Sequence, residues 1–167
     1  LEFRRVLFRS SLVMELLRQC TDLIAAHFRQ ESPAFRYAAL CLVEFEAVAM
    51  NQLVRETYYE GYTTPLTFEK ITDHLADMTG RIFGDSLGLS KEDIFLRSLL
   101  IKGAMRSYIV QFDFRQPMDS QKYAALVLDT ALQLLGISAA ESHDVLAQLE
   151  QRLPEIEAIA DEMIHRR

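Results

Sequence analysis

Residues that mark disulfide-rich, membrane-spanning or β-sheet proteins are scarce in this sequence. The two cysteines, Cys20 and Cys41, are too few for a disulfide framework, and we expect both to be small buried residues in a reducing cytoplasm. No apolar run reaches the roughly 18 residues that a membrane span needs, because charged residues interrupt every candidate. Glycine, proline and clusters of β-branched residues are few, which favours an all-helical chain.

Motifs for catalysis, phosphate binding and metal binding are also missing. There is no nucleophile elbow, and Gly80, Gly84 and Gly88 lie at or after a predicted helix end and do not form a phosphate loop. Glu162 and His165 have the Glu-x-x-His spacing of ferritin-like di-iron bundles, but only one copy occurs. No short metal-ligand spacing relates the four histidines, which are His27, His74, His143 and His165. We therefore expect no enzyme, no metal and no cofactor.

The first ten residues, LEFRRVLFRS, resemble the translation of a common short-read sequencing adapter, and every codon fits. The alternative is a basic amphipathic arm that binds phosphates or a membrane. We expect residues 1–10 to be artefactual, so that the true N-terminus is missing, and we exclude them from predictions of the fold. Without Arg4, Arg5, Arg9 and Glu2, the net charge changes from −6 to −8. This acidic balance argues against nucleic-acid binding by residues 11–167.

Residues 11–167 have the length of one domain with a substantial core. Apolar residues three and four apart predict a bundle of about six to seven helices. Helix N-caps are predicted at Ser32, Ser90 and Ser138. Gly136 is a predicted helix stop, and Pro154 predicts a kink or two abutting segments in the last helix.

Two successive helices are predicted within residues 90–136. The first has an apolar face and a second side with polar residues, the latter being Ser98, Lys102 and Arg106. The apolar face consists of Ile101, Ala104, Met105, Tyr108 and Phe112. The second helix is apolar over most of its circumference. This pattern favours a helix that packs on its own domain with one side and on another chain with the opposite side. The alternative is a fully buried helix in a monomer.

These two helices carry a family resemblance. LLIKGAMRSYIV, a short turn and PMDSQKYAALVLDTALQLLG closed by glycine resemble the last two helices of the ligand-binding domain of tetracycline-repressor (TetR/AcrR) family regulators, and the resemblance covers most of residues 12–136. It implies a homodimer in which these helices form a four-helix bundle with their symmetry mates. It also implies a DNA-binding helix-turn-helix before Leu12, which is missing here. The dimer contacts that we predict are Leu100, Ala104, Tyr108, Tyr123, Val127, Leu128, Ala131, Leu132 and Leu135.

A cavity between the central helices is expected to bind a small, mostly apolar effector. The predicted lining residues are Glu44, Met50, Tyr59, Tyr62, His74, Met78, Met105 and Tyr108. Glu44 and Glu46 lie two apart in an otherwise apolar helix, so they face different ways. One of them is a candidate to receive a cationic or hydrogen-bonding ligand; reaching the surface or pairing with an arginine is the alternative. The alternative for the tyrosines is ordinary packing where a helix meets a turn. The alternative for His74 is a structural histidine whose hydrogen bonds are satisfied within the protein.

The sequence and its resemblance therefore predict the effector-binding and dimerisation domain of a bacterial, cytoplasmic TetR-like transcriptional repressor. Effector binding would shift the separation of the missing DNA-binding heads by favouring one of two arrangements. DNA would be contacted only through those heads, and no membrane would be involved. The alternatives are a stand-alone helical protein-interaction module without small-molecule sensing, and a four-helix-type metalloenzyme.

Overall fold

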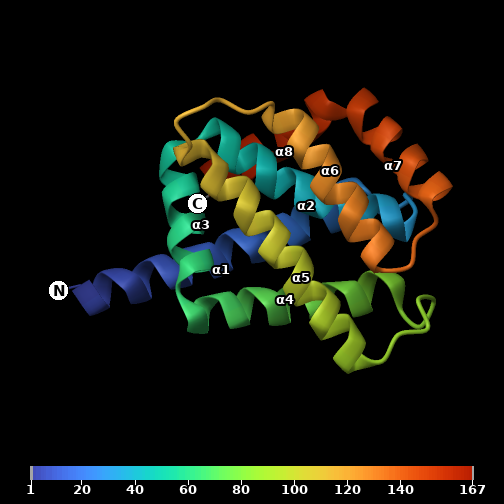
Figure 1. Cartoon of the computed structure of the whole chain (residues 1–167), viewed down its shortest axis with the longest axis horizontal. Helices are drawn as coiled ribbons and strands as arrows, with labels where there is room; N and C mark the ends of the chain where they lie inside the picture. Colours follow the sequence, from blue (N-terminus) through green and yellow to red (C-terminus); the bar gives the residue numbers. More distant parts are fainter. Residues whose placement is uncertain (1, 167) are drawn as a thin grey trace.

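The computed structural model describes residues 2–166, and that part of the chain is all helical, with no β-strand (Figure 1). The predicted all-α class is confirmed. The helices are α1 (Glu2–His27), α2 (Pro33–Met50), α3 (Gln52–Thr63), α4 (Pro65–Phe83), α5 (Lys91–Val110), a 3₁₀ turn (Gln111–Asp113), α6 (Ser120–Leu134), α7 (Ala139–Gln151) and α8 (Leu153–His165). The prediction of six to seven helices was too low. Eight α-helices lie within the described residues, because the chain breaks into α7 and α8 just before Pro154, which lacks a backbone donor.

Local sequence signals set most of the helix ends. The hydroxyls of Ser32, Ser90 and Ser138 each accept a hydrogen bond from the backbone N–H three residues later, at 3.1–3.2 Å, as predicted for N-caps. Gly136 follows α6 with a φ of 84°, a conformation that glycine adopts at little cost, and it ends that helix as predicted.

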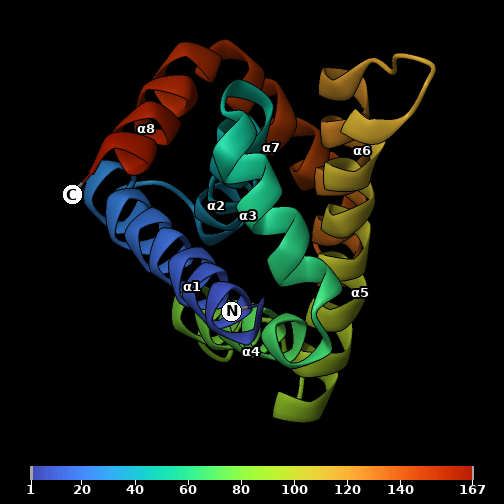
Figure 2. The same cartoon turned by 90° about the vertical axis from the view of Figure 1, so that its left-hand side faces the viewer.

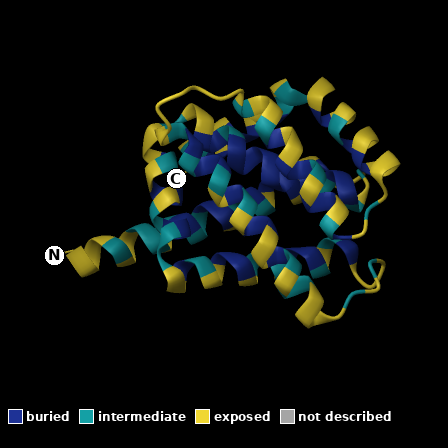
Figure 3. Ribbon diagram, in the orientation of Figure 1, coloured by how far each residue is buried: buried dark blue, intermediate teal, exposed yellow. Residues whose placement is uncertain are grey.

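Helix α2 lies at the centre of the molecule and contacts all of the other α-helices. Nearly its whole circumference is buried, whereas the surrounding helices bury one side and expose the other (Figure 3). Its sequence, PAFRYAALCLVEFEAVAM, explains this position, because a helix that is apolar on all sides needs partners on all sides.

The other helices surround α2 in two groups. Helices α1, α3 and α4 pack against one another, and α6, α7 and α8 cover the opposite side of α2. Helix α5 joins the two groups, since it contacts α3 and α4 as well as α6 (Figure 2). The core is therefore formed by faces of all eight helices. No helix in residues 2–166 combines the length and apolarity that a membrane crossing needs.

The segment predicted to be artefactual forms the first turns of α1, which run without a break into residues 11–27. These turns project beyond the rest of the molecule and expose Phe3 and Phe8 (Figure 1). The Arg9 guanidinium lies 2.5 Å from a carboxylate oxygen of Glu60. Residues 2–10 are thus helical, but they add little to the core.

Helix α5 corrects one prediction about which residues face solvent. Ser98 and Lys102 were expected on a polar side of the helix, yet both are fully buried, and Arg106 alone of the three is exposed. Helix α5 contacts α2, α3, α4 and α6, and its buried residues include Ser98 and Lys102. This arrangement brings a lysine into the centre of the domain.

Candidate functional site

A buried ion pair lies in the core of the domain. The Lys102 ammonium nitrogen is 3.1 Å and 3.4 Å from the two carboxylate oxygens of Glu44. Lys102 also donates to the Tyr62 hydroxyl at 3.0 Å, and that hydroxyl donates in turn to Glu44 at 3.5 Å. The exposed fractions of the three residues are 0% for Lys102, 3% for Glu44 and 2% for Tyr62. We call Glu44, Tyr62 and Lys102 the core triad.

Three different helices supply the core triad. Glu44 comes from α2, Tyr62 from α3 and Lys102 from α5, and these three helices contact one another pairwise. The side chain of Asn51 caps α3 by accepting from the Val54 N–H at 3.0 Å, directly after the end of α2. This tight junction returns α3 along α2 and places Tyr62 beside Glu44.

Burial and charge oppose each other at Glu44. Burial raises the pKa of this carboxyl above its ordinary value, while the Lys102 charge and the hydrogen bonds from Lys102 and Tyr62 lower it. Burial also raises the pKa of Tyr62 well above its ordinary range, and the Glu44 charge adds to that effect. Buried charges of this kind are costly unless they are paired and hydrogen-bonded. The Glu44 carboxyl is therefore the group in this site that most readily gains a proton.

Three more hydroxyls lie in the core and belong to Tyr37, Tyr58 and Ser98; those of Tyr58 and Ser98 have no hydrogen-bond partner among the described residues, whereas Tyr37 has the Thr79 hydroxyl within reach. Tyr58 stacks on Tyr62 with ring centres 6.2 Å apart, and Ser98 lies one helical turn before Lys102 on α5. Tyr37 has Thr79 as a polar neighbour, whose hydroxyl donates to the Leu75 carbonyl.

An unpaired buried hydroxyl costs about 1–3 kcal/mol, so such groups normally have a partner. All three residues are almost fully buried. Like the core triad, they are buried polar side chains of α2, α3 and α5 inside an apolar core. We call these six residues the core polar cluster. A ligand that accepts hydrogen bonds would satisfy the unpaired hydroxyls.

Five of the eight residues predicted to line a cavity are buried in this core. Glu44 and Tyr62 belong to the core triad, and Met78 and Met105 are almost completely buried. Tyr108 is buried too, but it belongs to an aromatic group with Phe45, whose ring centre lies 4.2 Å away, and with the rings of Phe112 and Tyr123. Burial raises the pKa of Tyr108.

The other three predicted lining residues lie elsewhere. Met50 and Tyr59 are 45% and 42% exposed, because they face outward at the end of α2 and on the outer side of α3. His74 is half-buried on α4 and shares a hydrogen bond of 3.1 Å with the Thr21 hydroxyl, which agrees with the alternative of a structural histidine. Burial and the Lys102 charge lower the pKa of His74. These residues are not brought together with the core triad.

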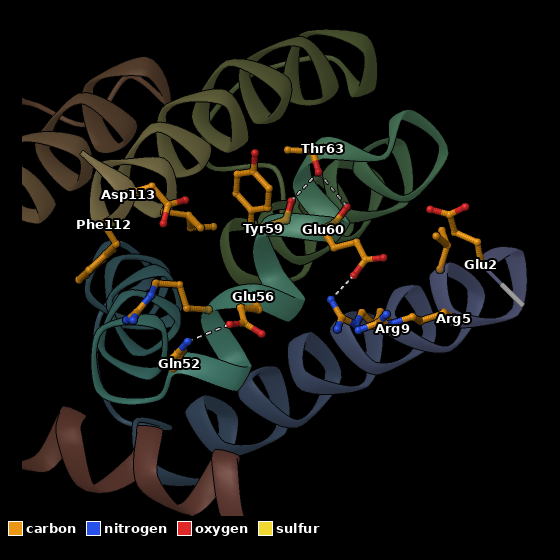
Figure 4. A pocket seen from close by; sticks show the side chains of 13 residues that line it. Glu2, Arg5, Arg9, Gln52, Glu56, Tyr59, Glu60, Thr63, Phe112 and Asp113 are labelled. Carbon is orange, nitrogen blue, oxygen red and sulfur yellow. Dashed lines mark hydrogen bonds and ion pairs between the residues drawn. The ribbon is translucent and has the colours of Figure 1, made fainter. Parts of the chain in front are cut away.

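Tyr59 contributes to a surface pocket of about 610 Å³ between α1, α3 and the end of α5. Figure 4 shows Glu2, Arg5 and Arg9 on one wall of this pocket. That wall consists of the residues predicted to be artefactual. We therefore assign no function to this pocket.

A second groove of about 490 Å³ lies between α2, α6 and α7. Glu46 lines it, so Glu46 reaches the surface while Glu44 points into the core. The two glutamates face different ways, as their spacing predicts. Burial and the nearby Glu157 charge raise the pKa of Glu46. Leu128, a predicted dimer contact, is almost completely buried and also lines this groove.

Most of the predicted dimer contacts pack inside the chain. Among them, Leu100 is 61% exposed, and Ala104 and Tyr123 are half-buried. The remainder are buried against their own domain and consist of Tyr108, Val127, Leu128, Ala131, Leu132 and Leu135. The outward sides of the two helices instead present Leu96, Leu99, Leu100 and Leu126. A partner chain docking on α5 and α6 would meet those four leucines.

Sequence reasoning missed Lys102, Ser98, Tyr37 and Tyr58 as residues of the site. The available signal was Glu44 itself, since a carboxylate in an apolar helix requires a cation or several donors. The donor is 58 positions away on a helix of mixed polarity, so nothing local identifies it. The Glu-x-x-His pair is exposed, and no group of three or more potential metal ligands gathers within residues 2–166.

No family model, no curated protein and no solved structure matches this chain.

Proposed function

We propose that this chain is the ligand-sensing and dimerisation portion of a bacterial TetR-like transcriptional repressor. A small apolar or amphipathic effector binds in the core and controls DNA binding by a helix-turn-helix that lies outside the chain. The chain acts as a sensor and not as an enzyme, works as a homodimer in the cytoplasm and contacts DNA only through that missing domain.

The core polar cluster is the observation that carries this proposal. Its charged pair and unpaired hydroxyls stand in the middle of an apolar core, where an all-apolar interior would be at least as stable. Groups of this kind are retained where they bind something or specify one arrangement of helices. A few polar groups converging within an apolar surrounding are also typical of small-molecule sites.

The cluster joins α2, α3 and α5, and this suggests how binding is transmitted. An effector that pairs with Lys102 or the free hydroxyls changes which contacts hold these three helices together. Any arrangement in which the effector makes more contacts becomes more populated. Helix α1, which packs on α3 and α4, would carry the change to whatever precedes residue 11.

The dimer surface in this proposal is the outward side of α5 and α6. These helices lie side by side, and they expose Leu96, Leu99, Leu100 and Leu126 (Figure 2). Four exposed leucines on two adjacent helices form an apolar surface of the kind that marks protein interfaces. An isologous contact between two copies would cover it on both.

A thermal-shift screen of small apolar and amphipathic compounds tests the sensing function. A compound that raises the melting temperature of the wild type is then measured on Tyr58→Phe and Ser98→Ala, which remove two unpaired hydroxyls. We expect both variants to fold and to lose part of the shift. The Glu46→Gln variant changes the surface groove and serves as the control, with the full shift retained. If no compound stabilises the wild type, a helical interaction module without a small-molecule site becomes the better explanation.

A further inference from the structure

The core polar cluster contains one buried negative charge and one buried positive charge, so its net charge is zero. The titratable groups that surround Glu44 come from four helices and are Cys20 on α1, Tyr37 and Cys41 on α2, Tyr58 and Tyr62 on α3, and Lys102 on α5; the Lys102 charge also acts on His74 of α4. Among these, burial raises the pKa of the cysteines and of the tyrosines and lowers that of His74, which favours their neutral forms. A ligand that added an uncompensated charge here would meet a large desolvation penalty.

The same cluster has more hydrogen-bond donors than acceptors. Lys102 supplies an ammonium group with three N–H donors, and four hydroxyls add one donor each. The strong acceptors are the two carboxylate oxygens of Glu44, which Lys102 and Tyr62 already use. The hydroxyls of Tyr58 and Ser98 have no acceptor among the described residues. The site is therefore suited to a group rich in acceptor oxygens, and ill suited to an amine.

We propose that the effector of this chain is a weak organic acid with an apolar body, which exchanges with Glu44 as the counter-ion of Lys102. The inference rests on the sensing function proposed above and names the chemical class of its ligand. On binding, the acid's oxyanion pairs with the Lys102 ammonium and accepts from the free hydroxyls. Glu44 takes up one proton and becomes a neutral carboxylic acid, so the net charge of the site remains zero.

The proton balance of this exchange is explicit. At neutral pH the acid is ionised in solution, and the site holds Lys102 as an ammonium and Glu44 as a carboxylate. The bound state holds the ammonium, the acid's anion and a protonated Glu44, so each binding event removes about one proton from the buffer. The raised pKa of Glu44 lowers the cost of that uptake. No bond other than the O–H bond on Glu44 is formed.

Matched probes test this class directly. Benzoic and hexanoic acids are compared with benzyl alcohol and hexan-1-ol, and with benzylamine and hexylamine, so that only the polar group differs within each series. We expect the acids to raise the melting temperature, and the alcohols and amines to leave it unchanged. Titration calorimetry of a binding acid in buffers of different ionisation enthalpy then counts protons, and we expect uptake of about one per acid bound.

Two variants test the roles of Glu44 and Lys102 in this exchange. In Glu44→Gln no carboxylate competes with the acid's anion for Lys102, so we expect tighter binding by about tenfold or more. In Lys102→Met binding of the acids should be lost. Glu46→Gln, which changes the surface glutamate, should behave as the wild type. If one of these variants does not fold, the number of protons taken up by the wild type still tests whether the acid exchanges with Glu44.

Three results would overturn the proposal in distinguishable ways. Stabilisation by the alcohols or amines and not by the acids would refute the weak-acid class, while the sensing function would stand. A wild-type acid that binds without proton uptake would refute the exchange with Glu44. If none of the six probes stabilises the protein, the weak-acid class is wrong, and the wider thermal-shift screen decides separately whether the sensing function fails too.

Discussion

The ammonium nitrogen of Lys102 lies 3.1 Å from a carboxylate oxygen of Glu44, and both side chains are buried in the core. The two residues come from α5 and from the central helix α2. Such a pair contributes little net stability, because desolvation of both charges offsets their attraction, but breaking it leaves one charge alone in the core. The effects of substitutions at the two positions on the free energy of unfolding are therefore not additive.

The first prediction concerns this non-additivity. Lys102→Met alone should lower the free energy of unfolding by roughly 3–5 kcal/mol, because Glu44 loses its counter-ion. The double variant Lys102→Met/Glu44→Gln removes both charges and should recover most of the loss. Urea denaturation measures both values. A double variant as unstable as Lys102→Met would mean that the loss of stability does not come from an uncompensated charge on Glu44.

A second prediction concerns pH. The pKa of Glu44 is raised above its ordinary value of 4.5, so its contribution to stability is present below that pH and is lost as pH rises toward the raised pKa. Between those two values the unfolded chain binds fewer protons at this residue than the folded one. The difference in unfolding free energy between wild type and Glu44→Gln should therefore change with pH in this window, in the direction of a less stable wild type at higher pH.

Asp129 provides the opposite case for comparison. Hydrogen bonds from Ser142 and Gln133 lower the pKa of Asp129 below its ordinary value of 3.8. The contribution of Asp129 to the stability of the folded state is present above pH 3.8 and is lost as pH falls. Asp129→Asn should thus reduce the sensitivity of the domain to acid, whereas Glu44→Gln alters stability at higher pH. Equal pH profiles for the two variants would contradict the assignment.

A third prediction concerns the contact between the α7–α8 junction and the α1–α2 connection. The Arg152 guanidinium lies 4.9 Å from the ring centre of Phe28 and 5.1 Å from that of Phe35. It also pairs with Glu31 at 2.6 Å and with Glu155 at 2.9 Å. Arg152→Ala should lower the free energy of unfolding by about 1–2 kcal/mol, since it removes both ring contacts and two partly exposed ion pairs.

Arg18 is a matched control for Arg152. It also pairs with two carboxylates, Glu15 and Asp22, but it is exposed on α1 and no aromatic ring lies beneath it among the described contacts. Arg18→Ala should change the free energy of unfolding much less than Arg152→Ala does. Equal losses from the two substitutions would show that the rings beneath Arg152 contribute nothing.

A fourth prediction concerns dimerisation. Leu100 and Leu126 are 61% and 59% exposed on α5 and α6, so glutamate at both positions should leave the fold intact and abolish dimers in light scattering. Leu53→Glu, on the exposed side of α3, is the control and should leave the dimer unchanged. Charge at Leu128 or Leu132 would not be informative, since both are buried in their own domain and the domain would unfold.

A dimer that survives the double substitution at Leu100 and Leu126 would place the interface elsewhere. A wild-type chain that is monomeric at high concentration would argue against a homodimer altogether, and against the repressor proposal with it. Circular dichroism of the variants establishes that each is folded before its oligomeric state is compared.

Local sequence signals predicted the helices well, because caps and stops act over a few residues. Ser90, Ser138 and Gly136 end or begin helices where the pattern indicates. Lys102 could not be predicted as a core residue, because a lysine on a helix of mixed polarity is ordinarily solvated. Its burial is decided by α2, α3 and α4 together, and sequence periodicity along α5 does not contain that information.

The candidate site was predicted in part for a similar reason. Glu44 and Tyr62 were identified because each is conspicuous in its own helix, as a lone carboxylate and as one of a group of tyrosines. Met50 and Tyr59 are exposed instead: Met50 lies at the end of α2, and Tyr59 lies on α3, whose rotation relative to α2 is set at the break at Asn51. That rotation depends on tertiary packing around the junction.

The central position of α2 has a consequence for the order in which the protein is made. Helix α8 covers part of α2 with Ile156, Ile159 and Met163, which are buried, yet it follows α2 by about a hundred residues. During synthesis from the N-terminus, that side of α2 therefore has no permanent partner until α8 has left the ribosome. A translating chain would expose an apolar helix through most of its elongation, and a chaperone that binds such helices would find its substrate there.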